Sequence, residues 1–378
     1  MSFTDLKLPL ELIAALARQQ ITEPTPIQIA ALPALLEGKD AYLHAETGTG
    51  KTLAYLLPLF CRIDLALAAT QIVIVAPTHE LALQIQRQSC DLAQDAGMAL
   101  RSVLLIGGTS TQRQLDKLKK KPHVVVGSPG RIGEMISRGK LKTRDVRCVV
   151  IDEADLLLSG ENRQSVLTII RAAPPSRQLV FASATRDKHS TAEIGALSPG
   201  LVMLKAGAAP VTEAIEHLYL QCEERDKPDE LRKLLHCLAP ERALVFVHRN
   251  DVAVTVAGKL AHHHIPAADL NAANDKHSRK QAMDGFRSGS IRVLIASDIA
   301  ARGLDIKGVT LVVNLDAPTL SKAYLHRTGR TGRAGAKGLA VSLVTESEER
   351  VIRRYQEELD IAMQCVRMRE GRLLPAAG

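Results

Sequence analysis

A glycine-rich segment near the start of the chain has the composition of a phosphate-binding loop. Residues 45–52 read AETGTGKT and lead into LAYLLPLF, an apolar stretch that predicts a helix. Backbone N–H groups at the start of a helix favour an anion. Lys51 can reach the β- and γ-phosphates of a nucleoside triphosphate, and the Thr52 hydroxyl can ligate Mg²⁺. Because the segment begins with alanine rather than glycine, it fits the relaxed form of the pattern. The residues expected to bind the nucleotide are Ala45, Glu46, Thr47, Gly48, Thr49, Gly50, Lys51 and Thr52.

The acidic segment DEAD, residues 152–155, is a second candidate for chemistry, and it follows the apolar run CVVI. Its carboxylates therefore emerge at the C-terminal end of a predicted buried strand, where open α/β sheets bind their ligands. Paired acids at such a place are often only a helix N-cap. The phosphate-binding loop in the same chain favours a metal site instead. We expect Asp152 to hold Mg²⁺ through water and Glu153 to orient and deprotonate the attacking water.

Short β-branched runs alternate with helix-length segments along both halves of the chain. These runs begin at Gln71, Ser102, His123, Cys148, Gln178, His217, Ala243, Arg292, Thr310 and Leu339. Near-continuous apolar strands between helices predict mostly parallel sheets with helices on both faces. A chain of 378 residues is too long for one ordinary domain. We predict two α/β domains, residues 1–205 and 211–378, joined by a linker at residues 206–210, with the last residues, REGRLLPAAG, frayed.

The formal net charge is +8, and the excess of basic residues is present in both halves. This suits a polyanionic partner held by both domains, although a basic protein without such a partner is an alternative on charge alone. The six cysteines are scattered without a CxxC pair, which is typical of a reduced, cytoplasmic protein. We find no signal-peptide pattern and no apolar run long enough to span a bilayer, so no membrane association is expected.

The two motifs, in this order and separation, resemble those of the DEAD-box RNA helicases, and other segments match that family as well. The segment PTPIQ, which ends at Gln28, is similar to the family's adenine-reading element. The resemblance implies that Gln28 takes the adenine edge and that Phe3 stacks on the ring. The segment SAT, with Ser183 and Thr185, looks like the element that links hydrolysis to strand separation. Its hydroxyls are expected to hydrogen-bond to the acidic motif, which includes Asp155.

In the second half, residues 297–305, SDIAARGLD, resemble the motif in which the last residue, Asp305, binds the ribose and the first residues touch RNA. The resemblance places the RNA contacts mostly on small residues and backbone N–H groups at strand or helix ends, which suits backbone phosphates rather than base edges. Binding should therefore be largely sequence-independent and salt-dependent. The expected RNA contacts are Pro77, Thr78, Gly108, Ser128, Gly130, Arg131, Arg279, Ser297 and Asp298.

Residues 326–333, HRTGRTGR, are similar to the family's arginine-finger motif. This implies that Arg330 and Arg333 reach the γ-phosphate across a cleft and that His326 pairs with the acidic motif of the first domain. A donated arginine would stabilise the charge that a loose phosphoryl-transfer transition state spreads over oxygens. A plain RNA-binding patch is the alternative for this loop.

Some positions depart from the family pattern. His79 stands where an RNA-contacting Arg is usual, Asn271-Ala272 replaces a His-Gly pair, and Lys276 replaces a Gln. These changes lie at positions expected to affect RNA binding and not at positions expected to bind or hydrolyse ATP. We therefore hypothesise weak RNA affinity or weak stimulation of ATP hydrolysis by RNA. The histidine run at residues 262–264 predicts a solvated helix end rather than a metal site, since adjacent residues point around a helix.

The resemblance implies two tandem RecA-like domains of the P-loop NTPase type, with ATP and Mg²⁺ as cofactors and RNA as partner. The leading function is an RNA helicase that uses ATP hydrolysis to unwind or remodel short duplexes or RNA–protein complexes. An ATP-gated RNA clamp with little unwinding is the main alternative, and a DNA translocase of the same superfamily is another. We expect a monomer, whose RNA target a partner protein could select.

Overall fold

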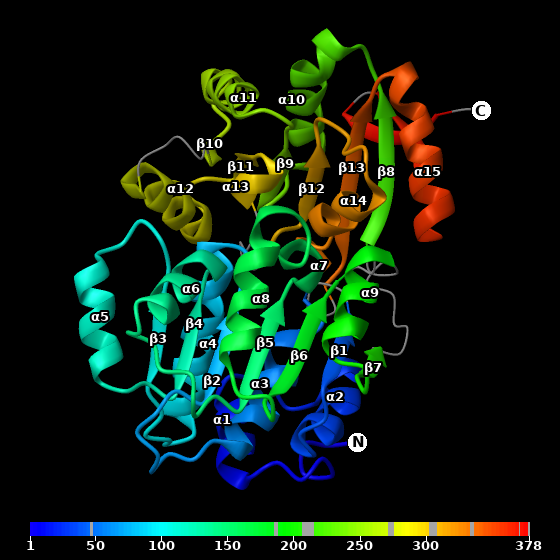
Figure 1. The fold of residues 1–378 in the computed structure, drawn as a ribbon. Helices are drawn as coiled ribbons and strands as arrows, with labels where there is room; N and C mark the ends of the chain where they lie inside the picture. Colours follow the sequence, from blue (N-terminus) through cyan, green and yellow to red (C-terminus); the bar gives the residue numbers. More distant parts are fainter. Residues whose placement is uncertain are drawn as a thin grey trace. The chain divides into compact units, whose positions relative to one another are not determined.

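The computed structural model describes residues 1–45, 48–184, 188–205, 215–270, 276–301, 308–332, 336–369 and 371–376. The chain divides into two units, Met1–Ala208 and Ala209–Gly378, and each contains one sheet (Figure 1). The predicted linker, residues 206–210, lies outside the described residues.

The first unit is built on a seven-stranded parallel sheet with the order β3-β4-β2-β5-β6-β1-β7 (Figure 1). Its strands are β1 (Ala41–His44), β2 (Ile72–Val75), β3 (Ser102–Leu105), β4 (Val124–Gly127), β5 (Cys148–Asp152), β6 (Gln178–Ser183) and β7 (Val202–Lys205). Its helices are α1 (Leu10–Arg18), α2 (Pro26–Leu36), α3 (Lys51–Arg62), α4 (His79–Asp95), α5 (Thr111–Lys119), α6 (Pro129–Ser137), α7 (Ala154–Leu157), α8 (Arg163–Ala172) and α9 (Lys188–Leu197).

Both faces of this sheet are buried, as its continuous apolar strands predict. Successive side chains of a strand point to opposite faces. In β2, Ile72 and Ile74 belong to an apolar cluster shared with α1, α2, α3 and α4. Val73 and Val75 belong to a second cluster, shared with helices from α5 to α9. A strand that is apolar at every position therefore lies between two layers of helices.

The second unit contains an eight-stranded sheet with the order β10-β11-β9-β12-β13-β8-β14-β15; among its described residues the β14–β15 pair is antiparallel and the other pairs are parallel. Its strands are β8 (Ile215–Gln221), β9 (Ala243–Phe246), β10 (Ala267–Leu270), β11 (Val293–Ala296), β12 (Leu311–Asn314), β13 (Gly338–Val344), β14 (Gln364–Arg369) and β15 (Arg372–Pro375). Its helices are α10 (Lys227–Leu238), α11 (Asn250–His262), α12 (Lys276–Ser288), α13 (Asp298–Ala301), α14 (Ser321–Thr328) and α15 (Glu349–Leu359).

The helices of the second unit also cover both faces of its sheet. Side chains from α10 and α11 pack with one set of strand residues, and side chains from α12 and α13 pack with the other. A further cluster joins α14 to α15.

The expectation of a frayed C-terminus is wrong for residues 372–375. These residues form β15, which pairs antiparallel with β14. Met368 and Leu373 lie opposite each other in this hairpin and pack against the same apolar cluster as α10. Burial of these apolar side chains offsets the entropy lost on ordering the end of the chain.

Candidate functional site

The predicted phosphate-binding loop, residues 45–52, follows β1 at the carboxyl edge of the first sheet. The backbone N–H of Ala45 donates to the carbonyl of Ser183 at the end of β6, 3.2 Å away. Gly48 and Gly50 have φ angles of 87° and 89°, a left-handed conformation that favours glycine. Helix α3 begins directly after Gly50, and the Lys51 ammonium donates back to the Ala45 carbonyl. The hydrogen bond from Lys51 therefore joins the end of the loop, where α3 begins, to the start of the loop at Ala45. Glu46 and Thr47 lie outside the described residues.

Gln28, the expected adenine-reading residue, is attached to this loop. Its side chain is only 1% exposed. Its amide oxygen accepts from the backbone N–H of Thr25 at 3.0 Å, and its amide nitrogen donates to the Gly50 carbonyl at 3.2 Å. A Cβ at Gly50 would lie 2.6 Å from that nitrogen, so glycine is required for this approach. The structure therefore joins Gln28 to the phosphate loop. Phe3 is buried in the apolar core of the unit, and its adenine contact stays a prediction.

Asp152 ends β5, and its carboxylate is held by two donors. The Tyr55 hydroxyl donates to Oδ2 and the backbone N–H of Glu153 donates to Oδ1, each at 2.9 Å. Burial raises the pKa of Asp152, while the charge of Lys51 and the two hydrogen bonds oppose that rise. The pKa of Tyr55 is raised well above its ordinary value, first by burial and then by the adjacent carboxylate. These contacts bring the helix after the phosphate loop into contact with the acidic motif.

The other two acidic motif residues differ in backbone and burial. Glu153 has a φ of 53°, a left-handed conformation that is unusual for a residue other than glycine. Asp155 is buried within α7. Ser183 is buried at the end of β6, while Thr185, its expected partner in coupling, lies outside the described residues.

A magnesium ion fits the donors that the first unit offers. Thr52 lies in the first turn of α3, and Tyr55 of the same helix donates to Asp152 at the end of β5, so hydroxyl and carboxylate oxygens lie at the same edge of the sheet. Mg²⁺ prefers such oxygen ligands and is commonly held by few protein groups together with phosphates and waters. In the described part of the chain no group of three or more His, Cys, Asp or Glu side chains could hold a metal. Because the protein offers few ligands, a magnesium ion here would take its other ligands from the phosphates of a bound nucleotide and from water.

The expected RNA contacts of the first unit follow three neighbouring strands, β3, β4 and β2. Thr78 caps α4, where its hydroxyl accepts from the Leu81 N–H at 3.1 Å. Pro77 precedes it, and Gly108 has a φ of 63°. The carboxyl ends of parallel neighbours share one edge, so the structure brings these loops together. The exposed residue His79 belongs to the same surface, because a Cβ at Gly107 would lie 3.5 Å from its Nε2.

The loop after β4 carries the other three expected contacts of this unit. Ser128 occupies the N-cap position of α6 without a capping hydrogen bond from its side chain, and Gly130 lies in the first turn of that helix. Arg131 donates to Glu134 at 2.6 Å and to the Thr111 hydroxyl at 2.9 Å. An RNA phosphate that binds Arg131 would therefore accept a hydrogen bond from a guanidinium that already donates to Glu134 and Thr111.

In the second unit, the expected RNA residue Asp298 is held by Arg327, a residue that the sequence analysis missed. The Arg327 guanidinium donates to both carboxylate oxygens of Asp298, at 2.6 and 2.8 Å. It also donates to the Asn314 side chain at 3.1 Å and to the Asp316 carbonyl at 2.6 Å. Arg327 lies over the Phe246 ring, 5.0 Å from its centroid. This buried arginine joins the motif that begins at residue 297 to α14.

Four of the remaining predicted residues of the second unit, Ser297, Arg279, His326 and Arg330, are described by the structure. Ser297 is buried directly after β11, and Arg279 of α12 donates to the Ala300 carbonyl at 2.7 Å. His326 is half-buried on α14, and Arg330 is half-buried just beyond the end of that helix. Asp305, Arg333 and the Asn271-Ala272 pair lie outside the described residues, as does the side chain of Lys276.

No helix in the described ranges is both long and apolar enough to cross a membrane.

Comparison with known proteins identifies both units. Residues 25–194 match the family model of the DEAD/DEAH box helicase, and residues 226–335 match that of the helicase conserved C-terminal domain. The chain is 40% identical over 351 residues to the DEAD-box ATP-dependent RNA helicase CshC of Bacillus cereus, covering 92% of this chain and 89% of that protein. It is also 40% identical over 342 residues to the probable ATP-dependent RNA helicase YfmL of Bacillus subtilis, covering 90% of each. Among solved structures, that of S. cerevisiae Dbp5 bound to RNA and ADP BeF3 matches with a TM-score of 0.87 and 30% identity, covering 97% of this chain and 95% of that one.

Proposed function

Since the chain belongs to the DEAD-box ATP-dependent RNA helicases, we propose that it hydrolyses ATP in the presence of RNA and uses that reaction to separate or remodel short RNA duplexes or RNA–protein complexes. Relatives named as RNA helicases cover nearly the whole chain. The observation in the fold that best supports the proposal is the hydrogen bond from Tyr55 to Asp152, at 2.9 Å. It connects the phosphate-binding helix to the acidic strand end on which hydrolysis depends.

In this proposal each site residue of the first unit has its own role in binding or hydrolysing ATP. Lys51 leaves the Ala45 carbonyl and pairs with the β- and γ-phosphates, and Gln28 positions the adenine beside the loop. A Mg²⁺ ion, when bound, would neutralise charge on the phosphates, with Thr52 and Asp152 as the residues that hold it. Glu153 accepts a proton from the attacking water. From the second unit, Arg330 and Arg333 stabilise the charge on the transferring phosphoryl group.

RNA binds through its backbone in this proposal. The loops after β2, β3 and β4 offer small residues, N–H groups at the starts of α4 and α6, and Arg131. Groups of this kind position the backbone and carry no sequence information. We propose that the chain acts as a monomer in the cytoplasm, and the choice of RNA then depends on another molecule.

An ATP-gated RNA clamp with little unwinding is the second candidate, and His79 favours it. This residue is exposed at the surface formed by the loops after β2 and β3, and its imidazole there would grip a phosphate less firmly than the arginine usual in the family. If the protein binds one RNA strand weakly, fewer duplexes would be separated for each ATP hydrolysed.

Steady-state ATP hydrolysis with and without single-stranded RNA tests the proposal. Glu153→Gln should abolish turnover and leave nucleotide binding intact, because only the proton acceptor is removed. RNA-stimulated turnover together with displacement of a short duplex supports the helicase. ATP-dependent RNA binding without displacement supports the clamp. Matched DNA serves as the nucleic-acid control, since only RNA offers the 2′-OH, and equal stimulation by DNA would contradict both candidates.

A further inference from the structure

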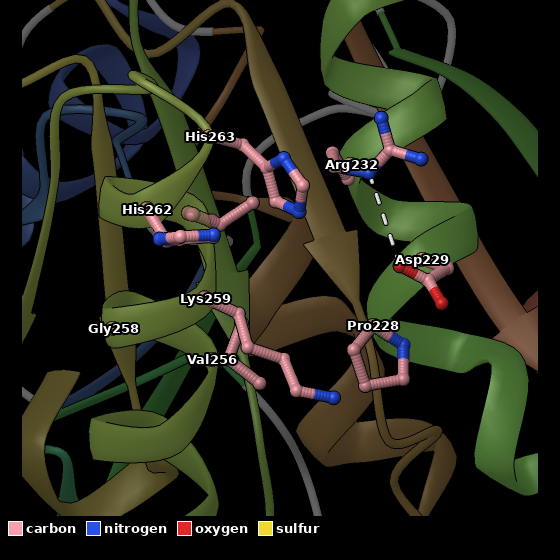
Figure 2. Close-up of a pocket in the computed structure, with 9 residues that line it drawn as sticks. Pro228, Asp229, Arg232, Val256, Gly258, Lys259, His262 and His263 are labelled. Atoms are coloured by element: carbon pink, nitrogen blue, oxygen red, sulfur yellow. Dashed lines mark ion pairs between the residues drawn. The ribbon is translucent and has the colours of Figure 1, made fainter.

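A pocket of about 400 Å³ lies in the second unit between α10 and the end of α11 (Figure 2). Its residues come from the first turns of α10 and the end of α11, and none of them belongs to the predicted nucleotide or RNA motifs, although His262 and His263 are part of the histidine run at residues 262–264. The residues lining it are Pro228, Asp229, Arg232, Val256, Gly258, Lys259, Leu260, His262 and His263.

The polar side chains of this pocket are mostly basic. The buried Nε of Arg232 has no hydrogen-bond partner among the described residues, and it forms an ion pair with the carboxylate of Asp229 at 3.8 Å. Lys259 is an exposed lysine in the lining of the pocket. Figure 2 shows Lys259 and His263 extending from α11 toward α10. The two cations outnumber the one carboxylate, so the pocket attracts a negatively charged group.

The rest of the lining is apolar. Val256 and Leu260 are buried members of the core cluster beneath the pocket, and Pro228 lies on the opposite helix. At Gly258 a Cβ would meet no atom within 4 Å, so space is open beside the α11 backbone. An apolar side chain of a ligand can therefore occupy the pocket while its charged neighbours reach the cations at the rim.

This combination favours a peptide over a nucleic acid. A nucleic-acid surface offers rows of cations for phosphates and, for single strands, aromatic rings for bases. Among the described residues that line the pocket there is no Phe, Tyr or Trp on which a base could stack, and the cations do not form a row. Protein interfaces, in contrast, combine an apolar anchor in a pocket with charge complementarity at the rim.

We propose that the pocket between α10 and α11 binds an acidic segment of a partner protein. One apolar side chain of that segment enters beside Gly258, and flanking carboxylates pair with Arg232 and Lys259. Such a partner would deliver the enzyme to its RNA without using the nucleotide site.

Fluorescence polarisation of the full chain with a short labelled peptide tests this assignment. The probe carries a central Phe flanked by Asp residues, and a peptide with Lys in place of Asp serves as the ligand control. We expect saturable binding of the acidic peptide only. The double variant Arg232→Glu, Lys259→Glu should raise its Kd at least tenfold. The control Arg171→Glu, Arg350→Glu makes the same change in net charge at exposed positions outside the pocket and should leave Kd unchanged.

A second pair of variants tests the shape of the pocket without changing charge. Gly258→Leu should fill the open space and raise Kd, whereas Gly258→Ala should not. Both replacements favour a helix over glycine, so loss of folding is not expected to explain the difference. ATP hydrolysis stimulated by RNA should be the same in all these variants, which separates this inference from the proposed function.

Three results would overturn the assignment. One is the absence of saturable peptide binding below about 1 mM, which corresponds to a binding free energy near −4 kcal/mol. Another is equal weakening by the control charge reversal, which would indicate only non-specific attraction. The third is a loss of oligouridylate affinity in the Arg232, Lys259 variant with unchanged peptide binding, which would assign the surface to RNA.

Discussion

The Tyr55 hydroxyl donates to Oδ2 of Asp152 at 2.9 Å, and both side chains are buried. Tyr55 also lies on the same helix as Thr52, three residues further along α3. The tyrosine thereby links the two residues that we propose hold Mg²⁺, one on the phosphate-binding helix and one at the end of β5. A phenylalanine could fill the same space in the core but could not orient the carboxylate.

The Tyr55→Phe variant should therefore need more Mg²⁺ for the same rate. A hydrogen bond to a charged group contributes about 1.5–3 kcal/mol, so we expect the Mg²⁺ concentration at half-maximal ATP hydrolysis to rise about tenfold. The measurement is RNA-stimulated turnover across a titration of MgCl₂ at fixed ATP. Tyr324→Phe makes the same chemical change in the second unit and is the control. An unchanged midpoint in Tyr55→Phe would show that the hydroxyl does not position Asp152.

Gln28→Glu should weaken ATP binding by separating α2 from the phosphate loop. The new carboxylate still accepts from the Thr25 N–H, but it cannot donate to the Gly50 carbonyl. Two acceptors then face each other in a buried place, which costs about 1–3 kcal/mol. We expect the KM for ATP to rise about tenfold and the melting temperature to fall by about 2–4 °C for each kcal/mol of this cost. Gln164→Glu, at an exposed position on α8, is the control, and equal KM values in the two variants would refute the role of Gln28.

Much of the fold could be predicted because its inner strands are buried on both faces. β2 reads IVIV and β9 reads ALVF, and such runs stand out in the sequence. The strands that the sequence analysis missed are short or lie nearer the sheet edges. β7 and β10 are only partly buried, and four-residue β1 lies directly before the phosphate loop. In these strands the apolar signal is too short or too mixed to predict a strand.

The candidate site could be predicted only where chemistry requires a local motif. The glycine-rich loop and the acidic segment are contiguous, so their residue types reveal them. Tyr55 and Arg327 are different, since their partners lie 97 and 29 residues away in sequence. Tyr55 reads as one more core residue of LAYLLPLF, and Arg327 reads as part of a basic loop. Only the packed structure shows that each holds a carboxylate in place.

Arg327→Lys should destabilise the second unit although it keeps the charge. A lysine has no planar guanidinium, so it cannot bind both oxygens of Asp298 and also reach the Asn314 side chain and the Asp316 carbonyl. Because Arg327 is only 1% exposed and Asn314 is fully buried, the Asn314 amide oxygen would lose its partner out of reach of water, whereas the Asp298 side chain is 38% exposed. We expect a loss of about 3 kcal/mol in the free energy of unfolding, measured by urea denaturation. Arg350→Lys on the exposed face of α15 is the control, and equal stability of the two variants would contradict this account.

His217 should make the stability of the second unit depend on pH. It is buried on β8, with Nδ1 2.8 Å from the Tyr324 hydroxyl and no partner for Nε2 among the described residues. Burial lowers the pKa of His217 from 6.5 to about 4. Between these values the unfolded chain binds a proton that the folded chain excludes, so stability falls as the pH falls, by up to about 1.4 kcal/mol per pH unit.

Urea denaturation near pH 7.5 and near pH 5.5 should show a loss about 1 kcal/mol larger for the unmodified protein than for His217→Gln, which has no such proton to bind. The other titrating groups are common to both proteins and cancel in this difference. Equal losses would mean that His217 accepts a proton in the folded state.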